Sequence, residues 1–462
     1  MKPYSIGLLP LYLELYDRSF TAFRPCAEAF YQDVAQGLRR QGLEVVTAPV
    51  CRLAAEFKRT IASFEKARVD ALVTLHLAYS PSLESAAELA ATRLPLIVLD
   101  TTPDFDFGPR QLPDKLMYNH GIHGVQDMCN LLRRNGKPFI ILAGHWQKSD
   151  VLKRVAQQLA SARMALSLRA ARVGRIGEPF KGMGDFTVPE RVLKALGVTT
   201  IPSHGPTIKR LVAAIRPAEI EAELSADRQK FSTAGLSAAA HRRSVLVGLA
   251  IRRWIRNEHL GAFTFNFLAI NRHSGFATVP FLEASKAMAR GLGYAGEGDV
   301  LTAALTGALM SAYPATTFTE MFCPDWKGNR IFLSHMGEVN LNLLAGRPRL
   351  QKAGYKLWEA EDPVMAVGCL RGGAAVLVNL APLAARKFRL IVAPVTMQTV
   401  RGRDNMKAMI HGWFRSLLPV ADFLAAYSRA GGTHHAALVY GSAAPQIIGF
   451  GELMGWDTMV LA

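Results

Sequence analysis

Cysteine is scarce in this sequence, and the few cysteines are widely scattered. Among the 462 residues there are five, namely Cys26, Cys51, Cys129, Cys323 and Cys369, and no two of them form a CxxC pair. An odd number of isolated cysteines excludes a disulfide framework and a zinc ribbon. We therefore expect the protein to work in a reducing compartment, the cytoplasm.

Long apolar runs are also missing. No segment approaches the roughly 18–20 uncharged apolar residues that a membrane-spanning helix needs. The apolar stretch at residues 5–9 is too short for a signal peptide, because Glu14, Asp17 and Arg18 follow it closely. With 50% hydrophobic and 20% charged residues, the composition is typical of a globular protein with two or three domains. These features predict a cytoplasmic protein without a membrane partner.

Negative charge is the third shortage. The chain has 54 Lys and Arg residues against 37 Asp and Glu residues, which gives a formal net charge of +17. Such an excess raises nucleic acid, a membrane surface or an anionic substrate as partners. Five arginines cluster on one predicted helix: Arg242, Arg243, Arg252, Arg253 and Arg256. No nucleic-acid-binding signature accompanies them, so we predict a solvated or subunit-contacting face and no nucleic-acid partner, and the charge itself stays unexplained.

Short apolar runs alternate with amphipathic stretches through the first 170 residues. The predicted strands are residues 5–9, 44–50, 71–75, 94–100 and 139–143. The helical patterns between and after them are residues 27–40, 51–66, 82–91, 122–133 and 149–162. Continuous apolar strands separated by helices are typical of βαβ units in a parallel sheet.

The rest of the chain divides into two further predicted domains. Residues 171–312 contain a strand-like run at 198–201, helical patterns from 217 to 258 and a last helix near 298–312. From residue 313 onward strand-like runs dominate, at 330–334, 364–370, 374–378, 389–395 and 435–440. The sequence thus predicts an α/β protein with domains 1–170, 171–312 and 313–462. We expect two Rossmann-like parallel-sheet domains followed by a β-rich C-terminal domain.

Four segments place a costly polar group beside chain that looks buried. They supply Glu297 in a glycine-rich turn, Glu320 at the end of a β-branched run, His335 in an apolar strand, and the pair His434 and His435. Each has an ordinary structural explanation when taken singly: a carboxylate favours a helix start, and a lone histidine is more often a hydrogen-bonded core residue. The spacings match no local zinc pattern, so spacing alone does not join them into one site.

These segments resemble the L-arabinose isomerase family, within the wider L-arabinose and L-fucose isomerase superfamily. The similarity is clearest over residues 262–335 and 431–435. It extends to residues 122–124 (IHG) and 143–147 (AGHWQ), which are similar to the His-Gly and Gly-His-Trp-Gln segments of the family. Several motifs in the right order join the four segments into one site, and the resemblance implies a fucose isomerase-like fold.

By this resemblance, Glu297, Glu320, His335 and His435 bind a divalent metal. Two carboxylates and two imidazoles with open positions suit octahedral Mn²⁺ best, with Co²⁺ and Mg²⁺ as alternatives. His434 is not expected among the ligands, because adjacent residues of a strand face opposite ways.

The reaction implied by the resemblance interconverts an L-arabinose-like aldose and its 2-ketose through an enediol. We predict Glu297 and Glu320 as the acid–base pair that moves a proton between neighbouring carbons. Tyr79, His123 and Phe267 resemble substrate contacts, with His123 contributed by a neighbouring subunit. The partner is then a small sugar, and the resemblance also implies a homo-oligomer, such as a hexamer, with active sites shared between subunits.

Two departures from the family pattern leave the sugar open. Residues 8–12 read LLPLY where the family has a substrate-contacting Gln, and residues 337–342 (GEVNLN) lack the usual Cys-Pro. One alternative is therefore an L-fucose isomerase-like enzyme, or another sugar isomerase or epimerase on the same scaffold. The other is a non-catalytic sugar sensor, which would have no need of two acids and two histidines on one metal.

Overall fold

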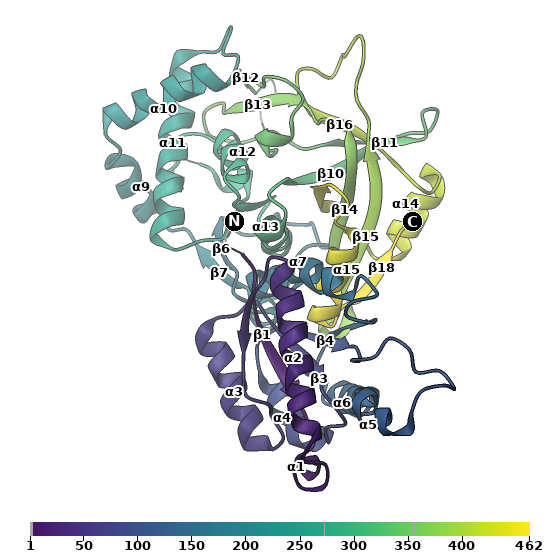
Figure 1. Ribbon diagram of the computed structural model, residues 1–462. Helices are drawn as coiled ribbons and strands as arrows, with labels where there is room; N and C mark the ends of the chain where they lie inside the picture. The colour runs from purple at the N-terminus through teal and green to yellow at the C-terminus, as the bar shows by residue number, and fades with distance from the viewer. Residues whose placement is uncertain (1–2, 272, 354–356) are drawn as a thin grey trace. The chain divides into compact units, whose positions relative to one another are not determined.

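A computed structural model describes residues 3–271, 273–353 and 357–462 of the chain (Figure 1). The chain forms two compact units, one of residues 1–166 with 448–455 and one of residues 167–447 with 456–462. Helices α7 (Val151–Arg169) and α15 (Ala444–Met454) contribute residues to both units. Within the described ranges, no helix is both long enough and apolar enough to cross a bilayer.

The first unit is built on a parallel sheet of five strands in the order β2-β1-β3-β4-β5. The strands are β1 (Ser5–Leu11), β2 (Glu44–Thr47), β3 (Ala71–His76), β4 (Leu96–Asp100) and β5 (Ile140–Ala143). The helices, besides α7, are α1 (Glu14–Ser19), α2 (Phe23–Arg40), α3 (Ala54–Ala67), α4 (Ser82–Ala91), α5 (Leu116–Asn119) and α6 (Gly121–Arg134). Strand β3 is buried at every position, as expected for a parallel sheet covered on both faces. The predicted parallel α/β arrangement is confirmed here.

The second unit contains a parallel sheet of four strands in the order β7-β6-β8-β9. The strands are β6 (Arg172–Ile176), β7 (Thr199–Pro202), β8 (Ala262–Phe265) and β9 (Gly293–Gly296). The helices are α8 (Glu190–Leu196), α9 (Gly205–Ala213), α10 (Pro217–Lys230), α11 (Ala238–Asn257), α12 (Phe281–Ala289) and α13 (Val300–Ala312). The helical patterns predicted from 217 to 258 form α10 and α11, and α11 begins where the Ser237 side chain accepts a hydrogen bond from the Ala240 backbone N–H.

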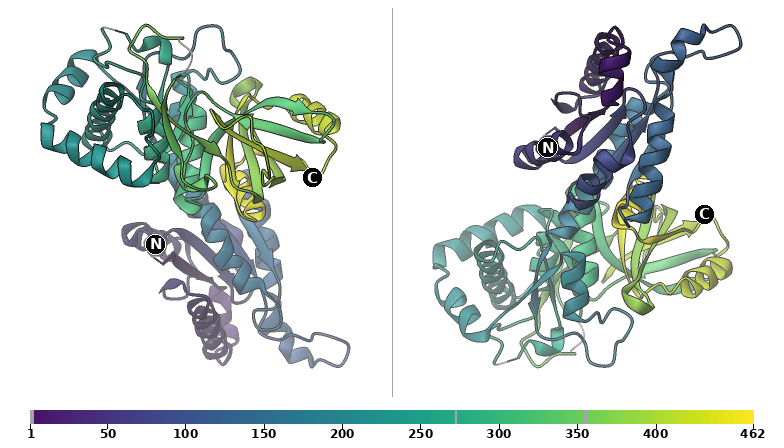
Figure 2. Two further views of the ribbon diagram at one scale, coloured as in Figure 1. Left: turned by 90° about the horizontal axis from the view of Figure 1, so that it is seen from above. Right: turned by 90° about the horizontal axis from the view of Figure 1, so that it is seen from below.

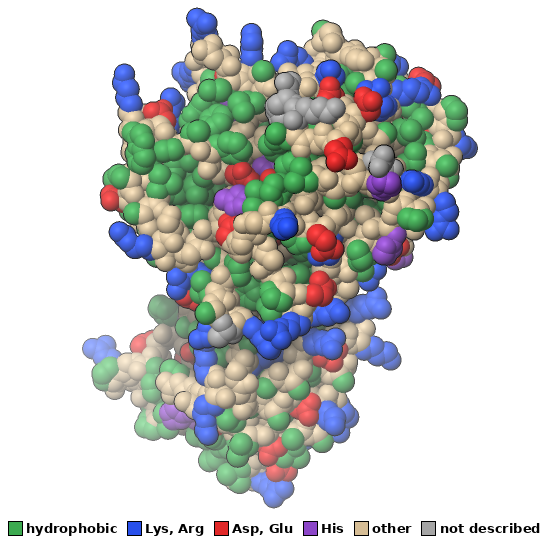
Figure 3. Space-filling model, turned by 180° about the vertical axis from the view of Figure 1, so that it is seen from behind, with side chains coloured by type: hydrophobic (Ala, Val, Ile, Leu, Met, Phe, Trp, Pro, Cys, Tyr) green, Lys and Arg blue, Asp and Glu red, His purple; other side chains and the backbone are tan. Residues whose placement is uncertain are grey.

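Four arginines of α11 form ion pairs with acidic residues of the same unit. The pairs are Arg242–Glu221, Arg243–Glu361, Arg252 with Glu223 and Glu283, and Arg253–Glu219. Acidic residues cover Arg252 and Arg253, whereas the Arg242 and Arg243 side chains stay 45% and 35% exposed. The solvated or subunit-contacting face therefore stays a prediction. Elsewhere, Lys and Arg side chains are spread over the face seen in Figure 3, with Asp and Glu side chains between them.

The β-rich part of the second unit contains a closed ring of strands. Nine strands follow the order β12-β13-β16-β11-β10-β17-β14-β15-β18, and an additional pairing of β15 with β16 closes the ring from β16 to β15. The strands are β10 (Thr316–Asp325), β11 (Arg330–Ser334), β12 (Arg349–Lys352), β13 (Val364–Cys369), β14 (Gly373–Pro382), β15 (Phe388–Met397), β16 (Ile410–Ser416), β17 (His435–Tyr440) and β18 (Asp457–Val460). Closure leaves no free edges within the ring.

Apolar residues of the ring and of α14 (Val420–Arg429) share one core. Leu333, Leu377, Phe414 and Leu438 lie in it together with Phe423 of the helix. The predicted β-rich C-terminal part is thus confirmed. The C-terminus lies at the edge of these strands (Figure 2), since β18 is the outermost strand beside β15.

Helix α13 explains why the second and third sheets belong to one unit. Nearly all of its residues are buried, and it has no charged side chain. It contacts β6, β8 and β9 of the parallel sheet as well as β10, β14 and β17 of the ring. A helix that is apolar on all sides needs such cover on all sides. Each of the three sheets lies within one of the three predicted segments, and the exact domain boundaries stay a prediction.

The contact between β9 and α13 allows a test of this packing. A Cβ atom on Gly293 would lie 2.5 Å from the Gly307 backbone nitrogen and 2.6 Å from the Ala303 carbonyl oxygen. Because backbone atoms must move apart to make room, Gly293→Ala is expected to destabilise the unit by about 1–3 kcal/mol, measured by thermal unfolding. Gly261→Ala is the matched control, since its Cβ would meet nothing within 4 Å. Equal melting temperatures for the two variants would contradict this packing.

Candidate metal centre

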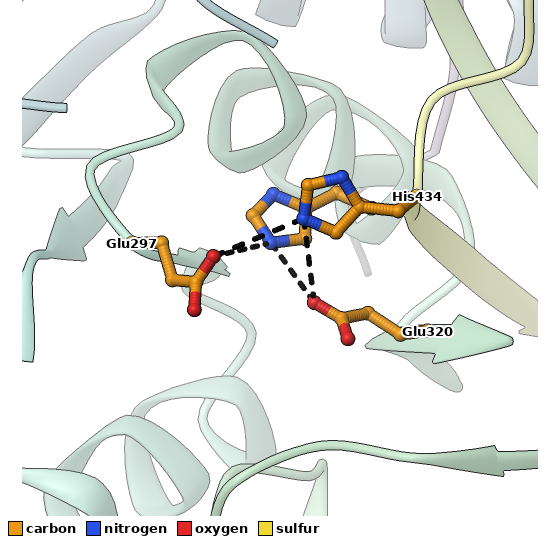
Figure 4. Close-up of side chains that lie close together, drawn as sticks. Glu297, Glu320 and His434 are labelled. Atoms are coloured by element: carbon orange, nitrogen blue, oxygen red, sulfur yellow. Dashed lines mark ion pairs between the residues drawn. The ribbon is translucent and has the colours of Figure 1, made fainter. Parts of the chain in front are cut away.

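Four polar side chains lie close together, at the end of β9, within β10 and at the start of β17. Glu297 follows β9, Glu320 lies within β10, His434 directly precedes β17, and His435 is the first residue of β17. The antiparallel pairing of β10 with β17 sets Glu320 opposite His435. Figure 4 shows Glu297 and Glu320 directed toward His434 from separate segments of the chain.

The Glu297 turn has an unusual backbone. Glu297 has φ of +60°, in the left-handed region that side chains other than glycine rarely adopt, and Gly298 follows with φ of +85°. A Cβ atom on Gly298 would lie 2.7 Å from the Pro179 Cα atom, so this position also needs glycine for space. Such strain is common where a side chain must be held at a functional position.

The distances between the donor atoms are short. The Nε2 atom of His435 lies 3.0 Å from Glu320 Oε1 and 3.6 Å from Glu297 Oε2. The Nε2 atom of His434 lies 3.8 Å from Glu297 Oε2 and 3.9 Å from Glu320 Oε1. One donor atom from each of these four residues lies within 4.8 Å of all the others.

His335 approaches the same carboxylates from β11. It directly follows that strand, and its Nε2 atom lies 3.3 Å from Glu320 Oε1. Its ring centroid is 6.2 Å from that of His435, and it is not part of the group of four donors. A Cβ atom on Gly296 would lie 2.8 Å from the His335 ring, so glycine leaves the space that this ring occupies. The structure therefore gathers all four predicted ligands and adds His434.

Alternation along a strand does not apply to His434, because His434 lies outside the strand. Strand β17 begins only at His435, so the alternation of strand side chains does not apply to the pair. The two imidazole rings lie 4.3 Å apart and both face the two glutamates. Glu320 ends the β-branched run of the sequence but not the strand, since β10 continues to Asp325 with an irregular register just after Glu320.

Each of the three imidazoles has a carboxylate at its other nitrogen. The Nδ1 contacts are His335 with Glu338 at 2.6 Å, His435 with Asp299 at 2.9 Å and His434 with Asp185 at 2.7 Å. A carboxylate at Nδ1 fixes the ring and leaves Nε2 to face the centre, as is usual for metal-binding histidines. Sequence reasoning missed all three acids. Asp299 and Glu338 lie two and three residues from predicted ligands, but no local signal links Asp185 to His434.

The two glutamates are ionised at neutral pH. Burial raises the pKa of the Glu297 carboxyl, but the adjacent imidazoles of His434 and His435 outweigh burial and lower it to about 2. Burial also raises the pKa of Glu320, and the charges of His335 and His435 outweigh it, so this pKa lies well below its usual range. Both carboxylates thus carry negative charge into a buried place.

The facing histidines are correspondingly basic. Burial lowers the pKa of His335, but the carboxylates of Glu338 and Glu320 raise it to about 10. For His435 the neighbouring carboxylates, with Asp299 foremost, likewise outweigh burial, so its pKa lies well above the usual value. Without a metal ion, the positive charges of the protonated imidazoles therefore compensate the negative charges of the carboxylates.

The donor set fits a divalent cation. Glu297 Oε2 and His435 Nε2 are buried and have no hydrogen-bond partner within the described chain. Buried polar atoms normally have a partner, and a metal ion would provide one for both. Oxygen and imidazole donors with room for further ligands suit an octahedral ion.

The predicted substrate residues divide between the two units. Phe267 follows β8 in the second unit, is buried and lies 5.7 Å from the Phe180 ring. Tyr79 belongs to the first unit, where its hydroxyl donates to Asp127 at 3.3 Å. His123 belongs to the same unit and lines a cavity of about 520 Å³ at the carboxyl ends of β4 and β5. The roles of these three residues stay predictions.

Comparison with known proteins finds relatives over most of the chain. Residues 206–313 match the L-arabinose isomerase central domain, and residues 315–457 match the L-arabinose isomerase C-terminal domain. The L-arabinose isomerase of Herpetosiphon aurantiacus is 25% identical over 452 residues, which cover 92% of this chain and 88% of that one. Those of Anoxybacillus flavithermus and Geobacillus thermodenitrificans are 27% and 28% identical over 411 residues, covering 84% of this chain and 80% of theirs.

The domain matches and the relatives thus define a sugar isomerase. The chain belongs to the L-arabinose isomerase family. It is therefore an isomerase enzyme, which sets the sugar-sensor alternative aside. Among solved structures, a periplasmic sugar-binding protein of an ABC sugar transporter from Legionella pneumophila covers 66% of this chain and 93% of its own, at 10% identity and a TM-score of 0.16, a likeness too slight for any argument.

Binding of Mn²⁺ to the metal-free protein is expected to release protons and to tighten as the pH rises. The pKa values of His335 and His435 are raised, so both imidazoles hold protons at neutral pH, and a metal needs the neutral ring. Isothermal titration calorimetry in buffers of different ionisation enthalpy measures the protons released per ion. Binding without proton release, or binding that weakens from about pH 6 to about pH 8, would contradict this account.

Proposed function

We propose that the protein is a metal-dependent aldose–ketose isomerase that interconverts an L-arabinose-like aldose and its 2-ketose through an enediol. The observation that supports this most directly is the pairing of buried Glu297 and half-buried Glu320 with histidines. Within the described chain, Glu297 Oε2 and His435 Nε2 are buried there without a hydrogen bond. An isomerase of this kind needs groups that move one proton between neighbouring carbons, and carboxylates can do so.

Glu297, Glu320, His335 and His435 would hold the metal, with Mn²⁺ as the best match and Co²⁺ or Mg²⁺ as alternatives. When bound, the ion supplies Lewis-acid polarisation of the sugar oxygens next to the reacting carbons. The buried carboxylates of Asp299 and Glu338 keep the two inner imidazoles in place for this task.

The proton transfer itself falls to Glu297 and Glu320. In the forward direction one carboxylate accepts the proton from C2 of the aldose, and the other accepts the O2 hydroxyl proton and passes it to O1. The carboxyl group then returns its proton to C1, which yields the 2-ketose with no net gain or loss of atoms. A base must be ionised before it accepts a proton, and the lowered pKa values of both glutamates meet that condition.

Aromatic side chains limit water around these groups. The Phe318 ring lies 4.7 Å from the His335 ring and 5.0 Å from the His435 ring. Phe186 stacks on His435 at 4.8 Å with an angle of 19°. Apolar walls of this kind strengthen the electrostatic interactions within the site.

The remaining features of the proposal concern recognition. Tyr79, His123 and Phe267 would contact the sugar, in a fucose isomerase-like fold that assembles into a homo-oligomer such as a hexamer with shared active sites. A second candidate is an isomerase or epimerase of a different sugar, such as an L-fucose isomerase-like enzyme. The residues at the end of β1 favour this second candidate. Leu9, Leu11 and Tyr12 are fully buried there, and none of them has a side-chain amide that could contact a sugar.

Glu297→Gln and Glu320→Gln are each expected to lower kcat by about 10²- to 10⁴-fold, because an amide of equal size cannot accept the proton. Ketose formation with Mn²⁺ present measures the effect. Glu178→Gln is the control, since that carboxylate is 80% exposed and pairs with Arg175. Wild-type turnover in either variant would refute the assigned acid–base pair.

A panel of aldoses with Mn²⁺ tests the substrate. We expect the highest kcat/KM for L-arabinose or a closely related pentose. A clear preference for a hexose such as L-fucose would favour the second candidate. No turnover on any aldose by a protein that binds the metal would refute both.

A further inference from the structure

The loop of residues 178–186 contacts both Glu297 and the two adjacent histidines of the metal centre. At one end the Phe180 backbone N–H donates to the Glu297 carbonyl oxygen at 2.9 Å. At the other end Asp185 contacts His434 and Phe186 stacks on His435. The loop therefore links Glu297, which follows β9, to the two histidines at the start of β17.

Two hydrogen bonds join Asp185 to His434. The Asp185 Oδ2 atom accepts from the His434 backbone N–H at 2.9 Å and lies 2.7 Å from the ring Nδ1. A carboxylate oxygen only accepts, so Nδ1 carries the hydrogen and a neutral ring then has its lone pair on Nε2. One acidic side chain thereby fixes the position, the orientation and the tautomer of this imidazole.

The neighbouring residue holds Asp185 in place. Phe186 is only 3% exposed, and its ring lies 4.8 Å from the His435 ring and 5.6 Å from the His434 ring. Consecutive residues of the loop thus support consecutive histidines, one through hydrogen bonds and one through packing.

The fixed Nε2 atom lies where a shared cation would need a donor. Donor atoms bound to one octahedral ion at about 2.1 Å are roughly 3 Å apart when adjacent and roughly 4 Å apart when opposite. The distances of 3.8 and 3.9 Å from His434 Nε2 to the two glutamates fall in this range. In contrast to the buried His335 and His435, the His434 side chain is 39% exposed and its Asp185 partner 38% exposed.

We propose that Asp185 is a positioning residue of the metal centre, which holds His434 so that its Nε2 atom serves as an additional imidazole donor to the ion on the solvent-facing side. This inference rests on the proposed metal-dependent function. It adds a donor that the sequence comparison with the family did not imply and a role for an acid that no local motif marks.

Titration of metal-free protein with Mn²⁺ alone tests the proposal. Asp185→Ala and His434→Ala are each expected to weaken Mn²⁺ binding by about 10- to 100-fold. Asp185→Asn keeps a neutral acceptor and should weaken it less. Glu178→Ala, in the same loop, removes an exposed carboxylate that pairs with Arg175 and should leave the affinity unchanged. Thermal unfolding confirms that each variant is folded.

A double-mutant cycle separates positioning from general damage. If Asp185 acts through His434, then Asp185→Ala has no further effect on Mn²⁺ affinity in the His434→Ala background. ¹⁵N spectra of ring-labelled histidine in the metal-free protein give a second readout, because Asp185→Ala should shift His434 away from the Nδ1–H tautomer.

The outcomes also distinguish this inference from the proposed function. A wild-type protein that neither binds Mn²⁺ nor converts any aldose would refute both. Normal binding and turnover in wild type, with Asp185→Ala indistinguishable from Glu178→Ala, would overturn the role of Asp185 alone. A raised KM for sugar in Asp185→Ala with unchanged Mn²⁺ affinity would overturn the donor role of His434.

Discussion

The site depends on placing two ionised carboxylates together in a buried space. Glu297 and Glu320 would repel each other there and would lose much of their hydration, and either effect alone favours protonation. The imidazoles that face them reverse this preference, and each imidazole is itself held by a second carboxylate. As a result, the His335 and His435 rings each lie between two carboxylates, one at Nδ1 and one at Nε2. A divalent cation bound as proposed would take the place of the imidazole protons in balancing the two carboxylates.

The fold meets this constraint by bringing two different sheets against one helix. The parallel sheet delivers Glu297 at the end of β9, and the closed ring delivers Glu320 and His435 as a cross-strand pair of β10 and β17. Helix α13 packs against both sheets and begins at Asp299, whose carboxylate caps the helix through the Thr302 N–H and also contacts His435. One acid therefore joins the start of a helix, the Glu297 turn and a metal-facing histidine. The strain at Glu297 is tolerated because the packing on either side fixes that turn.

Much of this could be predicted from the sequence. Apolar runs flanked by helical patterns gave the parallel strands of the first unit, and β-branched runs gave most strands of the ring. The costly residues Glu297, Glu320, His335 and His435 stood out because a polar group beside apolar chain needs a partner. The alternation argument for His434 treated it as a strand residue, although the predicted run and β17 both begin at His435. Asp185 could not have been found, because its partner lies 249 residues away and the pairing exists only after both sheets have packed.

The three histidines differ in how much the fold depends on them. Asp299 and Glu338 are buried with their imidazoles, so removing either acid leaves an uncompensated charge in the interior, at a cost of about 3–5 kcal/mol. Asp185 and His434 are both more than a third exposed, and water can take over from a lost partner there. The inner pairs are thus tied to stability and the outer pair is not. A substitution at the exposed outer pair is therefore tolerated more readily than one at the buried inner pairs.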